Sequence, residues 1–406
     1  MSLIRGNVAF RRYWSARLVS YLGDQLARTA LLIAAYDAYG GTAVALLLLA
    51  STAPRLLGPL LGALADRFDQ RRLMVGCDLT QGLIYLTLAV LAPPLPVLLV
   101  AVTAATVAAT AFTPAGRGLL PRLVDLDRLP AANAQLAVGM NIGFAAGPAL
   151  GGLMLATVGL APTLIVDAAT FALSALLVGG VRTLSAAHPA GAPREPFHRV
   201  LGAGMRVVRT SGVVRAVSIG FLVLVTFAAL DNLALVPLGR AELAAGEVMI
   251  GLLGTAYGVG MVLGPMLLAR AGGRTRMQFV LYGAVLALGV GTLVTGASPV
   301  IGVALVGQAL AGAGAGWHHV AADTLIQQHV PAERLGVVFG TVYMFPYGAE
   351  VLAYLAGASL LGAIGPRWLL AVSGVGILAT LALVVPLLAR ALGGRAERRA
   401  AVAAVA

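Results

Sequence analysis

The chain has 406 residues, of which 59% are hydrophobic and only 11% are charged. This composition excludes an ordinary soluble domain, in which about 25% of the residues are charged. The formal net charge of +12 does not indicate a nucleic-acid partner, because basic residues beside membrane spans give the same excess. We therefore expect a membrane protein that binds no nucleic acid.

Twelve apolar runs are long enough to cross about 30 Å of hydrocarbon as helices. Short charged or Pro/Gly-rich breaks separate them. The sequence thus predicts an all-α membrane protein with twelve transmembrane helices. They are expected near 13–39, 43–65, 73–92, 96–119, 131–157, 161–183, 213–238, 246–270, 277–296, 300–323, 335–362 and 367–389.

The two halves of the chain resemble each other at an offset of 206 residues. Gly58-Pro59 recurs as Gly264-Pro265, Gly151 as Gly357, and Gly159 as Gly365. A duplicated set of spans is typical of carriers in which two similar bundles face a central cavity. We predict six-helix bundles at 1–184 and 213–406, the second with a short basic tail, joined by a cytoplasmic linker at 185–212 that includes an amphipathic stretch.

Basic residues mark one side of the membrane. Arginines before span one, after each even-numbered span and at the C-terminal end share that side, whereas the opposite loops carry almost none beyond Arg240 and Arg367. By the positive-inside rule both termini are cytoplasmic. Arg199, Arg206 and Arg209 of the linker are expected to meet lipid phosphates at the inner leaflet.

The loop after span two carries a recognisable pattern. Residues 62–72 read Gly62-Ala-Leu-Ala-Asp66-Arg67-Phe-Asp69-Gln70-Arg71-Arg72. This resembles the signature loop of the major facilitator superfamily, and the resemblance extends from Trp14 to Arg390. It is closest to bacterial drug and siderophore exporters of the macrolide-efflux and enterobactin-exporter type, with Gly23-Asp24 and Pro54-Arg55 as further points of similarity. Asp69 stands where that family commonly has Gly.

We interpret this loop as a gate. A carboxylate at Asp66 can contact a helix N-terminus or an arginine and so hold one conformation. Gly62, Arg67, Arg71 and Arg72 complete the gating loop, although Arg71 and Arg72 fit a solvated positive-inside loop equally well. Arg117 and Asp323, at equivalent positions in spans four and ten, are expected at an inner gate.

Span five contains small residues at four-residue spacing, which let helix backbones approach closely. Gly143, Gly147 and Gly151 share one face, Pro148 bends the helix, and Gly152 follows. The segment resembles the antiporter motif of superfamily exporters. Plain helix packing explains the same glycines, so antiport here follows from the resemblance alone.

Ionisable residues inside the spans are costly unless they face protein or water. Glu350, Asp24 and Asp231 are our candidates for proton coupling, with Glu350 first because no basic residue lies near it in sequence. Arg28 and Arg55 are expected to pair with Asp24, and Tyr343 and Tyr347 to line a cavity, although aromatic residues at this spacing also fit packing. Asp78 and Asp167, near span ends, are expected to be solvated or structural.

These features predict a secondary active transporter and not an enzyme. The sequence contains a single cysteine and neither a metal-ligand pattern nor a phosphate-binding Gly-Lys motif, so we expect no metal and no cofactor. We predict a monomer in the bacterial inner membrane that exports a drug-like or amphipathic small molecule in exchange for protons. A metabolite importer or uniporter of the same fold and a non-transporting lipid-handling or sensory protein remain alternatives.

Overall fold

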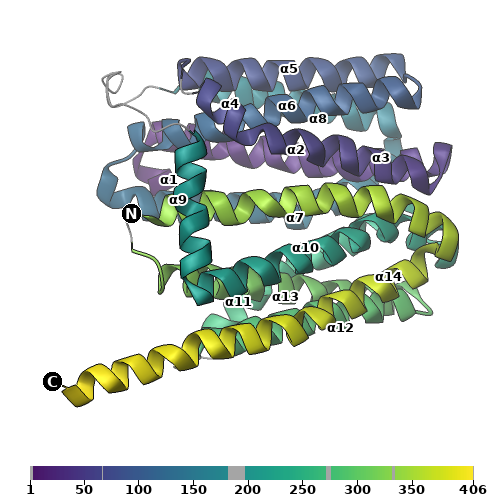
Figure 1. Cartoon of the computed structure of the whole chain (residues 1–406). Coiled ribbons are helices and arrows are strands. Elements are labelled where there is room, and N and C mark those ends of the chain that lie inside the picture. The colour runs from purple at the N-terminus through teal and green to yellow at the C-terminus, as the bar shows by residue number, and fades with distance from the viewer. Residues whose placement is uncertain (1–2, 66, 182–196, 271–275, 332–333, 406) are drawn as a thin grey trace. The chain divides into compact units, whose positions relative to one another are not determined.

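The computed structural model describes residues 3–65, 67–181, 197–270, 276–331 and 334–405, and every regular element in these ranges is a helix (Figure 1). The helices are α1 Leu3–Gly6, α2 Val8–Tyr39, α3 Gly41–Thr52, η1 Ala53–Leu57, α4 Gly58–Ala65, α5 Gln70–Leu91, α6 Leu95–Leu119, η2 Leu120–Arg122, η3 Leu126–Arg128, α7 Leu129–Val158, α8 Leu160–Gly179, α9 Phe197–Thr210, α10 Gly212–Pro237, η4 Leu238–Glu242, α11 Glu247–Arg270, α12 Met277–Ala297, α13 Ile301–Gln327 and α14 Leu335–Val405.

Nine helical stretches in the described ranges are long and apolar enough to cross a membrane. The last of them, Leu335–Gly393, has 59 residues, about twice the length that one crossing needs. It bends at Gly365, whose backbone is not helical. The expected first and tenth spans also form helices, α2 with 32 residues and α13 with 27. The protein is thus a multi-span helical protein, and the count of twelve spans in two six-helix bundles stays a prediction.

The chain divides into two compact units. Unit 1 contains residues 1–193 and 239–258, and unit 2 contains residues 194–238 and 259–406. In unit 1, α2 packs against α7 and α8, and α5 packs against α6 and α8. In unit 2, α14 packs against α10 and α12, and α12 against α13. Of the predicted linker, residues 185–196 lie outside the described residues.

Paired glycines show the internal repeat in the geometry. Gly159 between α7 and α8 has a φ of +85°, and its repeat mate Gly365 has a φ of +77°. A side chain at Gly151 would meet the backbone of Leu26, and one at Gly357 would meet the side chain of Leu233. Leu26 and Leu233 are themselves 207 residues apart, so corresponding helices pack through corresponding residues in the two units.

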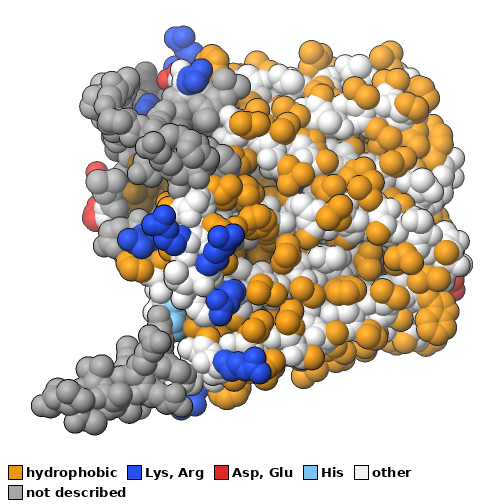
Figure 2. Space-filling view, in the orientation of Figure 1, with side chains coloured by type: hydrophobic (Ala, Val, Ile, Leu, Met, Phe, Trp, Pro, Cys, Tyr) orange, Lys and Arg blue, Asp and Glu red, His pale blue; other side chains and the backbone are white. Residues whose placement is uncertain are grey.

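The predicted amphipathic stretch forms α9, which runs crosswise to α10 (Figure 1). It packs on α14, where a Cβ atom at Gly204 would collide with the Thr341 side chain. Arg206 and Arg209 are exposed on it. Figure 2 shows apolar side chains over the faces of the helices and basic side chains near helix ends, the distribution expected of a protein surrounded by lipid.

Candidate transport site

Asp24 of α2 lies in the electrostatic range of two arginines, Arg17 and Arg55. Arg28, one turn further along α2, interacts instead with Tyr21 and Tyr85. Its buried Nε atom has no hydrogen-bond partner in the described part of the chain, and no ion pair joins Arg28 to Asp24 there. Asp24 is thus in range of Arg55, whereas Arg28 has other neighbours.

Asp231 of α10 is buried in unit 2, with 8% of its surface exposed. The Gln308 side-chain amide donates to Asp231 Oδ1 at 3.2 Å and lies 3.4 Å from Thr295 Oγ1. These residues connect α10, α12 and α13. Sequence reasoning found Asp231 as the repeat mate of Asp24 but gave no indication of its amide partner.

Glu350 of α14 accepts a hydrogen bond from Tyr354 Oη at 2.8 Å. Tyr354 is almost fully buried, whereas Glu350 is partly buried. The tyrosine therefore fixes one carboxylate oxygen of Glu350. Glu350 remains a candidate for proton coupling, and its hydrogen-bond partner Tyr354 lies one helical turn away.

The Tyr343 side chain has hydrogen-bond and ring partners inside unit 2. Its hydroxyl group donates to Asp323 Oδ1 at 2.5 Å, and its ring lies edge-on to Phe221 with centroids 5.3 Å apart. This contact joins α13 to α14 inside unit 2, so the packing explanation holds for Tyr343. Tyr347 is partly buried, and Arg117 in unit 1 is exposed beside Gly116.

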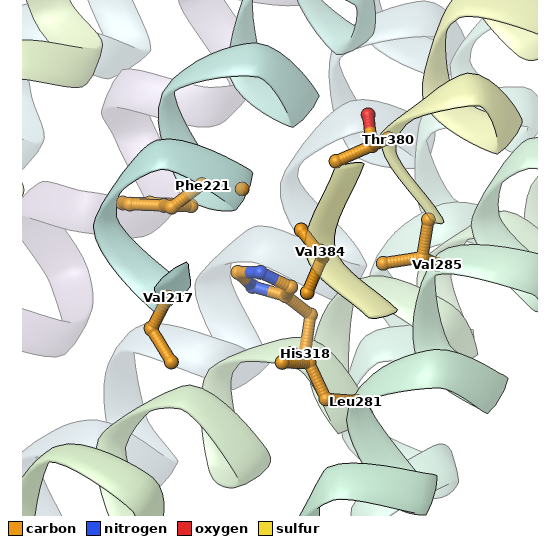
Figure 3. Close-up of a pocket in the computed structure, with 8 residues that line it drawn as sticks. Val217, Phe221, Leu281, Val285, His318, Thr380 and Val384 are labelled. Carbon is orange, nitrogen blue, oxygen red and sulfur yellow. The ribbon is translucent and has the colours of Figure 1, made fainter. Parts of the chain in front are cut away.

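His318 of α13 lies in the core of unit 2. Its ring stacks on Phe221 at 5.3 Å and lines a cavity of about 10 Å³ between α10, α12 and α14 (Figure 3). Val217, Leu281 and Val384 surround it. A space of this size holds about one water molecule, so the cavity cannot admit an organic substrate.

The glycines of span five face helices of unit 1. A Cβ atom at Gly147 would lie 2.4 Å from Gln25 Cβ, and one at Gly151 would lie 2.4 Å from the carbonyl oxygen of Leu26. Gly143 similarly faces Tyr21 and Leu22. These three residues form the α2–α7 seam, in which backbones approach as small residues allow.

A second seam joins α7 to the start of α11. A Cβ atom at Gly152 would lie 2.3 Å from the Glu247 carbonyl oxygen, and one at Gly251 would lie 2.4 Å from that of Pro148. Thr255 Oγ1 also accepts a hydrogen bond from the Ala149 amide at 3.0 Å. Gly151 therefore packs against α2 and Gly152 against α11, and the sequence did not predict this difference.

The gating loop combines helix caps with exposed charge. Asp69 is the N-cap of α5 and accepts from the Arg72 amide at 2.9 Å. Arg71 Nη1 donates to the backbone carbonyl oxygen of Val181 at 3.1 Å, just beyond the C-terminal end of α8. Basic side chains commonly bond carbonyl oxygens at such helix ends. Arg67 and Arg72 line an open groove of about 550 Å³. A Cβ atom at Gly62 would lie 3.8 Å from Pro114 Cβ, which is an ordinary van der Waals contact. Asp66 lies outside the described residues.

Sequence reasoning missed an arginine-centred cluster in unit 1. Arg240 Nε and Nη2 donate to Asp37 Oδ1 and Oδ2 at 3.0 and 2.7 Å. Nη2 also lies 2.6 Å from Glu247 Oε1, and Nη1 donates to the Ala245 carbonyl at 3.0 Å. The signal was present, because Arg240 is one of very few basic residues in the loops that the charge pattern sets opposite the arginine-rich ones.

Two aspartates do not occupy the places that we expected. Asp78 and Asp167 are both 0% exposed, so neither is solvated, and of the two expected alternatives the structural one remains. They lie mid-helix in α5 and α8, whose faces pack against each other. A polar stripe was readable in the sequence, because Asp167, Thr170 and Ser174 share one face of a helix.

The described residues therefore place embedded carboxyl groups in both units and no group of three or more His, Cys, Asp or Glu side chains that could hold a metal ion. The family model described as "Transmembrane secretion effector" matches residues 4–395. The chain belongs to this family of the major facilitator superfamily. As a major facilitator it is a membrane transporter and not an enzyme, and its family implies a small-molecule substrate.

Relatives in this superfamily include exporters. The multidrug efflux pump Tap of Mycobacterium tuberculosis H37Rv is 30% identical over 333 residues, covering 75% of each chain. Macrolide efflux protein A of Streptococcus pyogenes is 23% identical over 93% of this chain and 95% of its own. The MFS-type transporter YfiS of Bacillus subtilis is 26% identical over 89% of both.

Solved structures share the fold at low identity. The nucleoside transporter NupG matches with a TM-score of 0.72 and 12% identity, covering 93% of this chain and 99% of its own. A bacterial homologue of the iron transporter ferroportin matches with a TM-score of 0.69 and 17% identity, covering 95% and 99%. These proteins carry different cargo, so the likeness establishes the major facilitator fold and not a substrate.

Proposed function

We propose that this transporter exports an amphipathic, drug-like organic molecule across the bacterial inner membrane in exchange for protons. The observation that carries the proposal is the pair of glycine seams on α7. One helix meets α2 through Gly147 and α11 through Gly152, in both cases at backbone contact. Such seams hold helices tightly without interlocking side chains, which suits elements that must separate and close again during alternating access.

The relatives support efflux as the direction of transport. Tap and macrolide efflux protein A are efflux proteins by name, and together they cover most of this chain. Coupling to protons is supported by the embedded carboxyl groups. A membrane potential of about 100 mV supplies about 2.3 kcal/mol for each charge moved, enough for concentrative export.

Three finer assignments belong to this proposal. Asp24, Asp231 and Glu350 are candidates for proton coupling, the residue 62–72 loop with Asp66 is a cytoplasmic gate, and both termini are cytoplasmic. Arg206 and Arg209 of α9, which are exposed, would then face anionic lipid at the inner leaflet. We propose a monomer, because each unit buries its own core.

Transport into inside-out vesicles tests the function directly. A fluorescent macrolide derivative and a cationic dye serve as substrates, with the proton gradient imposed, collapsed by an ionophore, or absent. Export coupled to protons predicts uptake into the vesicles only with the gradient, and acidified vesicles should lose protons when substrate is added. Uptake that ignores the gradient would favour a uniporter, the second candidate.

A further inference from the structure

Two carboxyl groups lie inside unit 1 with incomplete hydrogen bonding. Asp78 Oδ2 accepts from Ser174 Oγ at 2.7 Å, and Asp167 Oδ1 lies 3.3 Å from Thr170 Oγ1. The second oxygen of each group, Asp78 Oδ1 and Asp167 Oδ2, is buried without a partner among the described residues. An ionised carboxylate in such surroundings has lost its hydration without replacement, which costs several kcal/mol.

Thr170 gives the Asp167 carboxyl group only weak support. Thr170 Oγ1 donates to the backbone carbonyl oxygen of Asp167 at 2.7 Å and lies 3.3 Å from Asp167 Oδ1. A hydroxyl group has one hydrogen to donate, so the carboxyl oxygen has at most the longer branch of a three-centre hydrogen bond. The Asp167 carboxyl group is therefore buried with little hydrogen bonding to stabilise a negative charge.

Asp167 forms no ion pair in the described part of the chain. Asp24 of α2 is in electrostatic range of it, and Arg28 of α2 is in range of its neighbour Tyr85. The titratable group of α5 that faces it is Tyr85. Asp78 has Asp24 and Arg17 of α2 in range and Cys77 beside it on α5. Because these acids form no group able to hold a metal ion, the ligand that fits is a proton.

Helix α2 covers Asp167 directly. A Cβ atom at Gly23 would lie 2.2 Å from Thr170 Oγ1 and 2.4 Å from Asp167 Oδ1, so only glycine lets the backbone rest there. The next residue is Asp24, and α2 also forms the seam with α7 at Gly147. A shift of α2 along that seam would lift the Gly23 backbone from the carboxyl group and admit water.

We propose that Asp167 is a proton-binding site of this transporter, closed by Gly23 of α2 and flanked by the hydrogen-bonded Asp78–Ser174 pair. When α2 moves away, the O–H bond of Asp167 breaks, the proton passes to water as hydronium, and the carboxylate remains until it is protonated again. The proposal rests on proton-coupled transport and assigns one site to it. It differs from the sequence candidates in lying on α8, behind α2.

Infrared difference spectroscopy of the purified protein in lipid tests the site without any transported substrate. Protonated carboxyl groups give a carbonyl-stretch band that shifts in deuterium oxide. We expect the wild type to lose part of this band as the pH is raised from about 5 to about 9. Asp167→Asn should abolish that part, and Asp125→Asn, on an exposed aspartate, should retain it. A titrating band that is undiminished in Asp167→Asn overturns the proposal.

A band that belongs to Asp167 but stays constant over the whole pH range also overturns it, because the residue would then be a permanent neutral acid. If Asp167→Asn fails to fold, wild-type protein labelled with ¹³C-aspartate replaces it. The absence of any titrating component with the isotope shift of aspartate again refutes the site. The vesicle experiment is independent: gradient-independent export with a titrating Asp167 band would refute antiport and leave the proton site standing.

Discussion

Arg240 holds Asp37 with two parallel hydrogen bonds, Nε to Oδ1 at 3.0 Å and Nη2 to Oδ2 at 2.7 Å. This fork fixes the segment 239–258 to the end of α2 within unit 1. Planar, bidentate recognition of this kind is a property of arginine that lysine lacks. The cluster with Glu247 therefore accounts for an arginine in a segment that otherwise contains no basic residue.

We expect Arg240→Gln to loosen this segment. Asp37 and Arg240 are partly exposed, with side chains 43% and 20% accessible, and pairs of this kind contribute about 0.2–1 kcal/mol. Hydrogen exchange of amides 239–258 should accelerate by about 1.4- to 5-fold, with Arg240→Lys in between. Arg206→Gln, which removes an exposed arginine elsewhere, is the control. Unchanged exchange in Arg240→Gln would show that the fork does not restrain the segment.

The α2–α7 seam predicts which glycines tolerate a side chain. Gly147→Leu and Gly151→Leu place a branched group where a Cβ atom alone would lie 2.4 Å from its neighbour, and overpacking costs about 1–3 kcal/mol. Export should fall while the protein still reaches the membrane. Gly147→Ala should be weaker but not neutral, since its methyl group already meets Gln25 Cβ.

Gly76→Leu provides the control for this series, because a Cβ atom at Gly76 of α5 would have no neighbouring atom within 4 Å. It adds the same group to an exposed helix face of the same unit. Vesicle uptake and membrane yield are measured together for all four variants. Wild-type export by both seam variants would mean that α7 does not use these glycines for packing during transport.

Glu350 and Tyr354 form a pair whose members can be separated by mutation. Glu350→Gln keeps the shape and still accepts from Tyr354 Oη, which lies 2.8 Å from the present carboxylate, but it cannot bind or release a proton. If Glu350 carries coupling, the variant loses the pH response of export and retains substrate binding. Tyr354→Phe should retain the pH response and change only its midpoint, as a positioning residue would. Gradient-driven export with an unchanged pH profile in Glu350→Gln would remove it from the candidates.

Sequence and structure agree where composition and spacing set the outcome. The helical ranges follow from apolar length, and the repeat spacing pairs Gly159 with Gly365, which share a positive φ. Partners across helices were not predictable in this way. Asp78 looks like a residue near a span end, and only the packing of α5 on α8 buries it beside Ser174. Arg240 and Asp37 are 203 residues apart, so no local pattern could join them.

The gating loop contains a helix cap that can be tested alone. Asp69 Oδ1 accepts the Arg72 amide at 2.9 Å at the start of α5, and loss of such a cap costs about 1 kcal/mol. Asp69→Ala should lower the unfolding temperature of the purified protein, whereas Asp69→Ser, which can still cap, should lie near the wild type. This departure from the family's usual glycine would then serve helix α5. Equal unfolding temperatures for Asp69→Ala and the wild type would show that the cap contributes nothing.

The bend within α14 depends on one glycine. Gly365 has φ 77° and ψ 171°, a region open essentially to glycine alone and costing about 1–3 kcal/mol for other residues. Gly365→Ala should therefore destabilise unit 2, although the added methyl group would touch nothing within 4 Å. Gly362→Ala, three residues earlier on the same helix, also has open space but a helical backbone, so alanine should be neutral or stabilising by up to about 1 kcal/mol. Thermal unfolding of the two variants separates backbone strain from side-chain crowding, and equal stability would show that the bend does not require glycine.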